Sequence, residues 1–250
     1  MRNEGYEPRQ MALPFDEPER FAAADFVDAP SNARARAALA APENWVNRRL
    51  VIWGEAGGGK SHLVWLWAAR TGAIRLDAAR LRAPASPGEA PLVIEDIDAA
   101  AAPLALFATL ERATQAAVPV LMTCRTPPAR LPIEPPDLAS RLRASLTIRI
   151  EPAEPALLDA LLHRLAAARQ MNLSPALHQF LLNHLPRRPA VLREAIARLD
   201  RYALALGTAP SRRLAERLVD ELADPDEGAA QTDPAARMPD PPAAAITSLL

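Results

Sequence analysis

Eight consecutive residues, Gly54 to Ser61, have the types and spacing needed to bind phosphate. They read GEAGGGKS and match the pattern G-x-x-x-x-G-K-[ST], between a predicted strand and a predicted helix. Glycine lets the backbone wrap around phosphate oxygens, where successive N–H groups and a helix N-terminus supply positive potential. The pattern predicts that Lys60 bridges the β- and γ-phosphates of a nucleotide and that Ser61 binds Mg²⁺. The glycines predicted to line this loop are Gly54, Gly57, Gly58 and Gly59.

The composition of the chain draws further attention to Lys60. Of the 29 basic residues, Lys60 is the only lysine, and arginine supplies the positive charge at every other position. A compact ammonium on a flexible stem reaches between phosphate oxygens where a broad guanidinium fits less well. The exception therefore supports a phosphate-binding role for Lys60. The alternative is a glycine-rich turn beside an unrelated lysine.

Two carboxylates end the apolar segment PLVIED, which finishes at Glu95 and Asp96. A buried strand would deliver them to the carboxyl-terminal edge of a sheet, beside the phosphates. We expect Glu95 to hold the water shell of Mg²⁺ and Asp96 to orient the attacking water. Phosphate-binding-loop ATPases more often have Asp before Glu, so the shorter second carboxylate predicts slow hydrolysis. The alternative is an exposed acidic turn.

Short apolar runs alternate with helical patterns up to about residue 150. The predicted strands are 49–53, 73–77, 92–95, 118–123 and 146–150, and the predicted helices are 31–41, 60–70 and 103–117. We expect Ser31 to cap the first helix and Pro42 to end it. The alternation predicts an α/β fold in which helices cover both faces of a parallel sheet.

Beyond residue 150 the pattern changes to helices alone, predicted at 154–169, 174–185, 188–206 and 210–222. A small helical lid domain is the simplest interpretation. The predicted organisation is a flexible N-terminus at 1–9, a separate peptide at 10–15, the α/β domain at 16–152, the lid at 153–222 and a disordered tail at 223–250.

Charge and composition limit the classes of function. The formal net charge is −1 and the pI is about 6.5, so we expect any contact with DNA to be local or indirect. One cysteine, Cys124, excludes an internal disulfide framework and suits a reducing compartment. The four histidines show no metal-ligand spacing in the sequence. No segment has about 18 uninterrupted apolar residues, so we expect a cytoplasmic protein that does not contact membranes.

Several separate segments together resemble a known family. They are DFVDAPSN at 25–32, LVIWGEAGGGKSHL at 50–63, the acidic strand end, MTCRTPP at 122–128 and DLASRLRASL at 137–146. In order and spacing this set is similar to the AAA+ module of DnaA, the bacterial replication initiator, and of the wider DnaA/Hda family. The resemblance runs from about residue 10 to residue 222.

The resemblance implies roles around an ATP or ADP ligand, without deciding between the two. Phe26, Val27 and Asn32 would form the adenine-side wall, and Thr123 would lie in the sensor 1 region. Arg193 resembles the sensor 2 arginine of the lid. Arg188 is the alternative for that role if the alignment with the family is shifted.

Arg141 matches the arginine finger of the family, which acts on the γ-phosphate of a neighbouring subunit. A planar donor that is always charged would stabilise the charge that develops on the transferred phosphoryl group. The alternative is that Arg141 and Arg143 merely flank the end of a helix.

A short peptide near the N-terminus resembles the Q-L-x-L-P-[LF] motif with which bacterial proteins dock on the replication sliding clamp. Its residues are Gln10, Met11, Ala12, Leu13, Pro14 and Phe15. By this resemblance, the amide of Gln10 would enter a small polar pocket, and the apolar side chains would fill a groove. The alternative is that this segment folds back on the core.

The resemblance implies a negative regulator of replication initiation that stimulates ATP hydrolysis by DnaA. DnaA carries a helix-turn-helix domain after its lid, whereas this chain has a Pro/Ala/Asp-rich segment there, so we expect DNA contact only through the clamp. A homodimer is compatible with the sequence. The competing hypotheses are a helicase-loading or clamp-loading AAA+ ATPase and a P-loop kinase, of which the all-helical second half disfavours the kinase.

Overall fold

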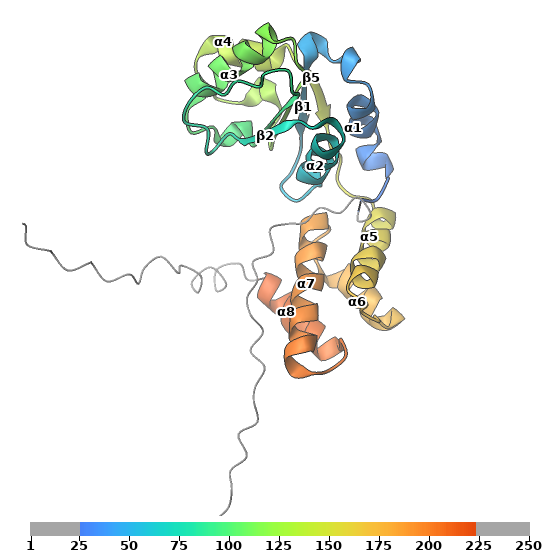
Figure 1. Cartoon of the computed structure of the whole chain (residues 1–250). Coiled ribbons are helices and arrows are strands. Elements are labelled where there is room, and N and C mark those ends of the chain that lie inside the picture. The colour runs from blue at the N-terminus through green and yellow to red at the C-terminus, as the bar shows by residue number, and fades with distance from the viewer. Residues whose placement is uncertain (1–25, 224–250) are drawn as a thin grey trace, which may run out of the picture.

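The computed structural model describes residues 26–223 (Figure 1). The predicted N-terminal segment, the peptide from Gln10 to Phe15 and the tail from residue 224 onward lie outside the described residues. The described part has a body built on a parallel sheet and, below it in Figure 1, a second body made of the helices that follow residue 154.

Five parallel strands form the sheet in the described residues. They are β1 (Arg49–Trp53), β2 (Ile74–Asp77), β3 (Leu92–Glu95), β4 (Val120–Cys124) and β5 (Leu146–Arg149), in the spatial order β2-β3-β4-β1-β5. Because all strands point the same way, the segments that follow β3, β4 and β1 meet at one edge. This edge of the sheet is where doubly wound α/β proteins bind their ligands.

Helices cover both faces of the sheet, and the alternation of side chains along each strand decides which helices each residue meets. On one face, Leu50 and Ile52 pack with α1 (Pro30–Ala40) and α2 (Lys60–Thr71). On the other face, Val51 packs with α3 (Pro103–Gln115) and α4 (Pro136–Arg143). The α/β fold class predicted from the sequence is therefore confirmed.

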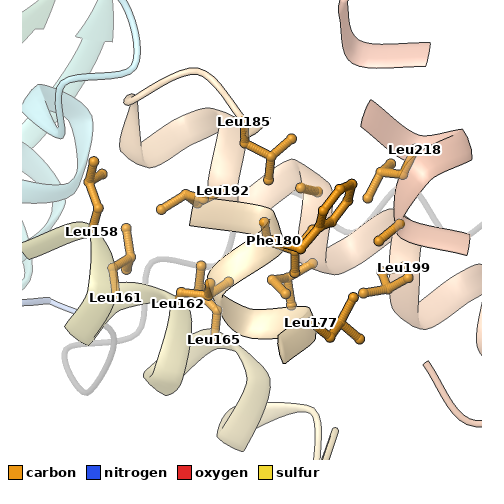
Figure 2. Close-up of a cluster of buried hydrophobic side chains, with 14 of the residues drawn as sticks. Leu158, Leu161, Leu162, Leu165, Leu177, Phe180, Leu185, Leu192, Leu199 and Leu218 are labelled. Carbon is orange, nitrogen blue, oxygen red and sulfur yellow. The ribbon is translucent and has the colours of Figure 1, made fainter. Parts of the chain in front are cut away.

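The second body consists of α5 (Pro155–Ala168), α6 (Pro175–His184), α7 (Pro189–Leu206) and α8 (Arg212–Ala223). Each of the first three begins with proline, which lacks the N–H that the first helical turn leaves without a partner. Their apolar faces meet in one cluster, shown in Figure 2 with Phe180 near its centre. This body is the helical lid expected from the sequence, although its exact domain boundaries remain a prediction.

The segment before α1 joins the two bodies. Val27 and Ala29 pack into the apolar cluster of the lid, whereas α1 itself packs on the sheet. The N–H and the hydroxyl of Ser31 both donate to the carboxylate of Glu154, the residue before α5, at 2.6 and 2.8 Å. Hydrogen bonds from its own backbone N–H and from Ser31 lower the pKa of Glu154.

The prediction that Ser31 is the N-cap of the first helix is wrong. The helix begins at Pro30, its N-cap is Ala29, and Ser31 lies inside the first turn. The carboxylate of Glu154, 123 positions further along the chain, binds the N–H of Ser31 in place of a local cap. A local sequence pattern could not reveal this partner.

Most predicted elements agree with the structure to within about two residues. The fourth strand begins at Val120 rather than at residue 118, because Pro119 has no N–H for the ladder. Helix α4 was not predicted, since it has only 8 residues and follows a proline-rich stretch. No helix within residues 26–223 is long and apolar enough to cross a membrane.

We expect Glu154→Ala to lower the stability of the protein by about 1–3 kcal/mol at pH 7, because two hydrogen bonds to a charged group are lost. Since the folded-state pKa of Glu154 is lowered, its stabilisation is present at neutral pH and is lost as the pH falls through that pKa. Thermal unfolding at pH 7 and at pH 3.5 measures both effects. The control is Glu151→Ala, an exposed neighbour that pairs with Arg149 at 3.5 Å; equal melting temperatures for the two variants would contradict the role of Glu154.

Candidate functional site

The loop after β1 has a backbone that only glycine adopts readily. Gly57 and Gly59 have φ of +77° and +96°, in the region that side chains disfavour. A Cβ atom on Gly57 would also lie 2.8 Å from the Cβ of Ala190 on α7, and the N–H of Ala190 donates to the carbonyl of Gly57 at 3.2 Å. The lid therefore rests directly on this loop.

Lys60 places a buried positive charge inside the loop. Only 7% of the residue is exposed, and its Nζ donates to the carbonyl oxygens of Gly54 and Glu55 at 2.7 and 2.8 Å. Burial lowers the pKa of Lys60, while the negative charges of Asp96 and Asp98 act in the opposite direction. A buried ammonium whose hydrogen-bond partners are neutral carbonyls, on a loop of glycines at the start of a helix, fits a phosphate group.

The carboxylates that face Lys60 come from the end of β3. The N–H of Asp96 donates to the hydroxyl of Thr123 at the end of β4, at 3.0 Å, and Asp98 accepts from the N–H of Arg125 at 3.0 Å. Burial raises the pKa of Asp96, Asp98 raises it further, and Lys60 opposes the shift. The strand order β3-β4-β1 therefore brings Asp96, Thr123 and Lys60 together.

Glu95 is engaged elsewhere. Its carboxylate pairs with the guanidinium of Arg75 on β2 at 2.6 Å, and its side chain is 17% exposed. The carboxylates available beside Lys60 are thus Asp96 and Asp98. Sequence reasoning missed Asp98, although the spacing Asp96-x-Asp98 directly after a strand is a usable signal. Ser61, the second residue of α2, is partly exposed next to Lys60.

Cys124 ends β4 next to Thr123 and is fully buried. Burial raises the pKa of its thiol to about 12, and its Sγ donates to the carbonyl of Thr126 at 3.0 Å. Because the thiolate rather than the thiol is the nucleophile, Cys124 is not a reactive group at neutral pH.

A cleft between the loop and the lid collects the residues predicted for the adenine side. It is lined by the predicted residues Phe26, Val27, Asn32, Gly58, Gly59 and Arg193, together with His62, Leu157 and Leu161. The ring of Phe26 meets the ring of His62 edge-on at 5.1 Å, and the amide of Asn32 binds the backbone of Val27 and Ala29. The cavity measures about 40 Å³, so entry of a purine ring requires Phe26 or the lid helices to move.

The two candidate sensor 2 arginines lie on different sides of the loop. Arg193 lines the adenine-side cleft, next to Gly58 and Gly59. Arg188 is the residue before α7 and lines a second cavity of about 180 Å³, with Glu55 and Arg125. Arg193 is therefore placed with the predicted adenine-side residues, and Arg188 is placed with the outer wall of the loop.

Arg141 lies at the opposite edge of the sheet from Lys60. Helix α4 runs from the carboxyl end of β4 back to the amino end of β5, and Arg141 sits in its last turn. It lines a cavity of about 460 Å³ with Arg49 and Val120, which are the first residues of β1 and β4. Strands of four or five residues separate the two edges by roughly 13–17 Å. Arg141 therefore cannot reach a phosphate held by the loop of its own chain.

Two neighbours set the position of the Arg141 guanidinium. It pairs with Glu111 of α3 at 2.7 Å and lies over the ring of Phe107, 5.1 Å from the ring centre. Burial lowers the pKa of Arg49, and the charge of Arg141 lowers it further. Arg48, Arg49 and Arg141 all line the cavity, so its wall is positively charged. Arg143, two residues further along, is exposed.

Comparisons of the chain with protein-family profiles and with curated proteins find no match. Solved structures do match. Domain III of the replication initiation protein DnaA from Thermotoga maritima aligns over 81% of this chain and 96% of its own, with 18% identity and a TM-score of 0.68. The chain has a DnaA-like AAA+ fold.

Two further structures support the same fold. AMPPCP-bound DnaA from Aquifex aeolicus aligns over 77% of this chain and 68% of its own, with 14% identity and a TM-score of 0.59. The Thermotoga maritima RuvB Holliday junction branch migration motor aligns over 79% of this chain and 70% of its own, with 17% identity and a TM-score of 0.57. At these identities the similarity shows the AAA+ fold and leaves the roles of individual residues as predictions.

We expect Lys60→Met to leave the nucleotide-free protein at least as stable as the parent at pH 7. The lowered pKa means that the charged lysine destabilises the folded state at every pH below that pKa, and methionine removes this cost. The same variant should lose stabilisation by added Mg-ADP, which at 100 times the dissociation constant contributes about 2.7 kcal/mol to the parent. Thermal unfolding with and without nucleotide tests both statements; a variant that nucleotide stabilises as strongly as the parent would exclude Lys60 as a phosphate ligand.

Proposed function

We propose that this chain binds ADP or ATP with Mg²⁺ and uses Arg141 to promote ATP hydrolysis by DnaA, in the manner of the DnaA-related regulator Hda. The observation that carries the proposal is the placement of Lys60 and Arg141 at opposite edges of one parallel sheet. A nucleotide on the loop and an arginine at the far edge cannot serve each other within one chain. Such an arginine can act only on a nucleotide held by a neighbouring molecule.

The loop and its surroundings support the nucleotide part. The buried ammonium of Lys60 and the glycine backbone fit phosphates, and the cleft at Phe26, Val27 and Asn32 fits a base once it widens. A structural neighbour, DnaA from Aquifex aeolicus, was solved with AMPPCP bound. When bound, Mg²⁺ would neutralise phosphate charge, and Ser61 with Asp96 would hold it or its water shell.

The arrangement of the carboxylates favours the interpretation that the chain itself hydrolyses ATP slowly. Glu95 is paired with Arg75 at 2.6 Å, so an ion pair already engages its carboxylate. Asp96 has a side chain one methylene shorter than glutamate, so its carboxylate reaches less far toward an attacking water. Nucleotide binding would then serve mainly to fix the position of the lid, which contacts the loop through Ala190.

Arg141 is suited to act on a phosphate outside its own chain. Its guanidinium stays charged at every physiological pH and presents planar donors to phosphate oxygens. The ion pair with Glu111 and the ring of Phe107 hold it at the rim of a cavity lined by Arg48 and Arg49. These two arginines add positive charge where an incoming anionic phosphate would lie. Arg141 would leave its ion pair with Glu111 and bind that phosphate instead.

The peptide Gln10, Met11, Leu13, Pro14 and Phe15 would bring the protein to the sliding clamp. It lies outside the described residues, so this part of the proposal depends on the sequence motif. Docking on a clamp loaded on DNA would place the chain near DNA without a DNA-binding surface of its own. DnaA and the clamp are therefore the proposed partners.

A helicase-loading or clamp-loading AAA+ ATPase is the second candidate. The similarity to the RuvB branch migration motor favours it, because that protein shares the same fold. It predicts rapid ATP turnover by the chain alone and self-assembly into rings on DNA. The ion pair between Glu95 and Arg75 argues for the first candidate, since a motor needs its acidic residues free for catalysis.

We expect Arg141→Ala to reduce DnaA hydrolysis of ATP to its unstimulated rate, since an arginine finger contributes about 10³-fold or more. The assay measures phosphate release by DnaA in the presence of this chain and a clamp loaded on DNA. Arg143→Ala is the matched control, because this arginine is exposed two residues away and should leave stimulation unchanged. Stimulation that survives Arg141→Ala, or that does not depend on the clamp, would contradict the proposal.

We expect Glu111→Gln to strengthen the stimulation of DnaA. The substitution keeps the size of the side chain and removes the charge that holds Arg141, whose side chain is 31% exposed in this ion pair. An ion pair at that exposure contributes up to about 1 kcal/mol, so the concentration of this chain needed for half-maximal stimulation should fall up to fivefold. A rise in that concentration would show instead that Glu111 positions the arginine for catalysis.

A further inference from the structure

Helices α5 and α6 bring together three side chains that can bind a metal ion, away from the nucleotide loop and from Arg141. They are Asp159, His163 and His178, and their ligand atoms all lie within 4.8 Å of one another. The sequence spacing of the histidines did not show this cluster, because His178 belongs to a different helix from the other two residues.

The lid itself fixes the cluster. Asp159 and His163 are four residues apart on α5, so their side chains lie on the same face, one turn apart. Helix α6 starts after Ser174, whose hydroxyl accepts from the N–H of Leu177 at 3.2 Å, and His178 follows in the next position. Leu162 and Leu177, which are buried in the same apolar cluster, hold the two helices together at this point.

The three side chains differ in how firmly they are held. His178 is 7% exposed, and its Nε2 lies 2.8 Å from a carboxylate oxygen of Asp159. The ring of His163 stacks on the ring of His178 with 4.0 Å between centres and an angle of 29°. His163 and Asp159 are exposed. One ligand is thus fixed within the lid, and the other two can move at a surface that solvent reaches.

We propose that Asp159, His163 and His178 form a Zn²⁺ site that links α5 to α6. Two imidazoles and one carboxylate suit Zn²⁺, whereas Mg²⁺ and Ca²⁺ prefer a shell of oxygens. Tetrahedral bonds of about 2.0–2.1 Å place ligand atoms about 3.3 Å apart. Asp159 and His178 already lie 2.8 Å apart, and rotation of the exposed His163 ring out of its stack would bring the third ligand atom, now within 4.8 Å, toward that spacing. Water would fill the fourth position.

Binding of the ion would stabilise the lid, because the ligands come from two helices that only the folded state brings together. Helix α5 also supplies Leu157 and Leu161 to the cleft beside the loop. A linked α5–α6 pair would therefore hold one wall of that cleft in place. This inference stands whether or not the chain acts on DnaA.

The first test is calorimetric titration of the full chain with ZnCl₂ in buffer that contains excess MgCl₂. We expect one Zn²⁺ per chain, with an affinity at least about tenfold weaker in His163→Ala. His184→Ala is the matched control: it removes an exposed histidine of α6 that stacks on Phe180 with 4.1 Å between ring centres, and should bind Zn²⁺ like the parent. Equal affinities for all three proteins, or no binding, would overturn the proposal. The cluster would then be only a stack of His163 on His178 with a contact between His178 and Asp159.

A second measurement guards against a variant that fails to fold. Co²⁺ bound in a tetrahedral site gives a visible absorption band that reports the ligand set. We expect this band in the parent and in His184→Ala, and its loss in His163→Ala and in Asp159→Asn. A band that persists in both ligand variants would place the ion elsewhere and overturn the proposal.

Discussion

The buried ammonium of Lys60 is the interaction on which the nucleotide site depends. It lies between the carbonyl oxygens of Gly54 and Glu55, where neutral acceptors replace the water that a lysine normally keeps. The lowered pKa shows that these acceptors and the acidic residues nearby do not fully offset the cost of burial. An anion in the loop would complete the compensation. The lack of a side chain at Gly57 also lets Ala190 of the lid lie against the loop.

The parallel sheet places the loop with Lys60 and the side chain of Arg141 at opposite edges. All groups that face Lys60 follow the carboxyl ends of β1, β3 and β4, whereas Arg141 is reached only after α4 has returned to the amino edge. In the proposed function, this order of strands and helices would let one chain bind a nucleotide at one edge and act on another nucleotide at the other edge. The ion pair between Arg141 and Glu111 holds the guanidinium at this second edge, and an incoming phosphate would have to replace the carboxylate.

The sequence predicted the parts of the fold whose signals are local. Apolar strands, the glycine loop and the lid helices were found because strand burial, turn geometry and helix periodicity are properties of neighbouring residues. The errors have long-range causes. Ser31 is bound by Glu154 from the lid rather than acting as a cap. The ion pair of Glu95 with Arg75 of the adjacent strand was likewise not predicted.

For the site, types of residue were easier to predict than their partners. Lys60, Asp96 and Thr123 lie near one another because strand ends converge at one edge of a parallel sheet, whereas their predicted roles stay predictions. Sequence reasoning missed Asp98, which lies beyond the strand end in a single helical turn. It also missed the pairing of Arg141 with Glu111 and the cluster on α5 and α6, since both join residues from different helices.

Isothermal calorimetry of the purified full chain with ADP and MgCl₂ tests whether the loop is a nucleotide site at all. We predict saturable binding of one ADP per chain, competed by ATP and weakened when Mg²⁺ is removed. The absence of saturable binding of either nucleotide in the presence of Mg²⁺ would contradict the assignment of Lys60 to phosphate. The role proposed for Arg141 would then lack support, because the proposal requires a bound nucleotide to fix the position of the lid.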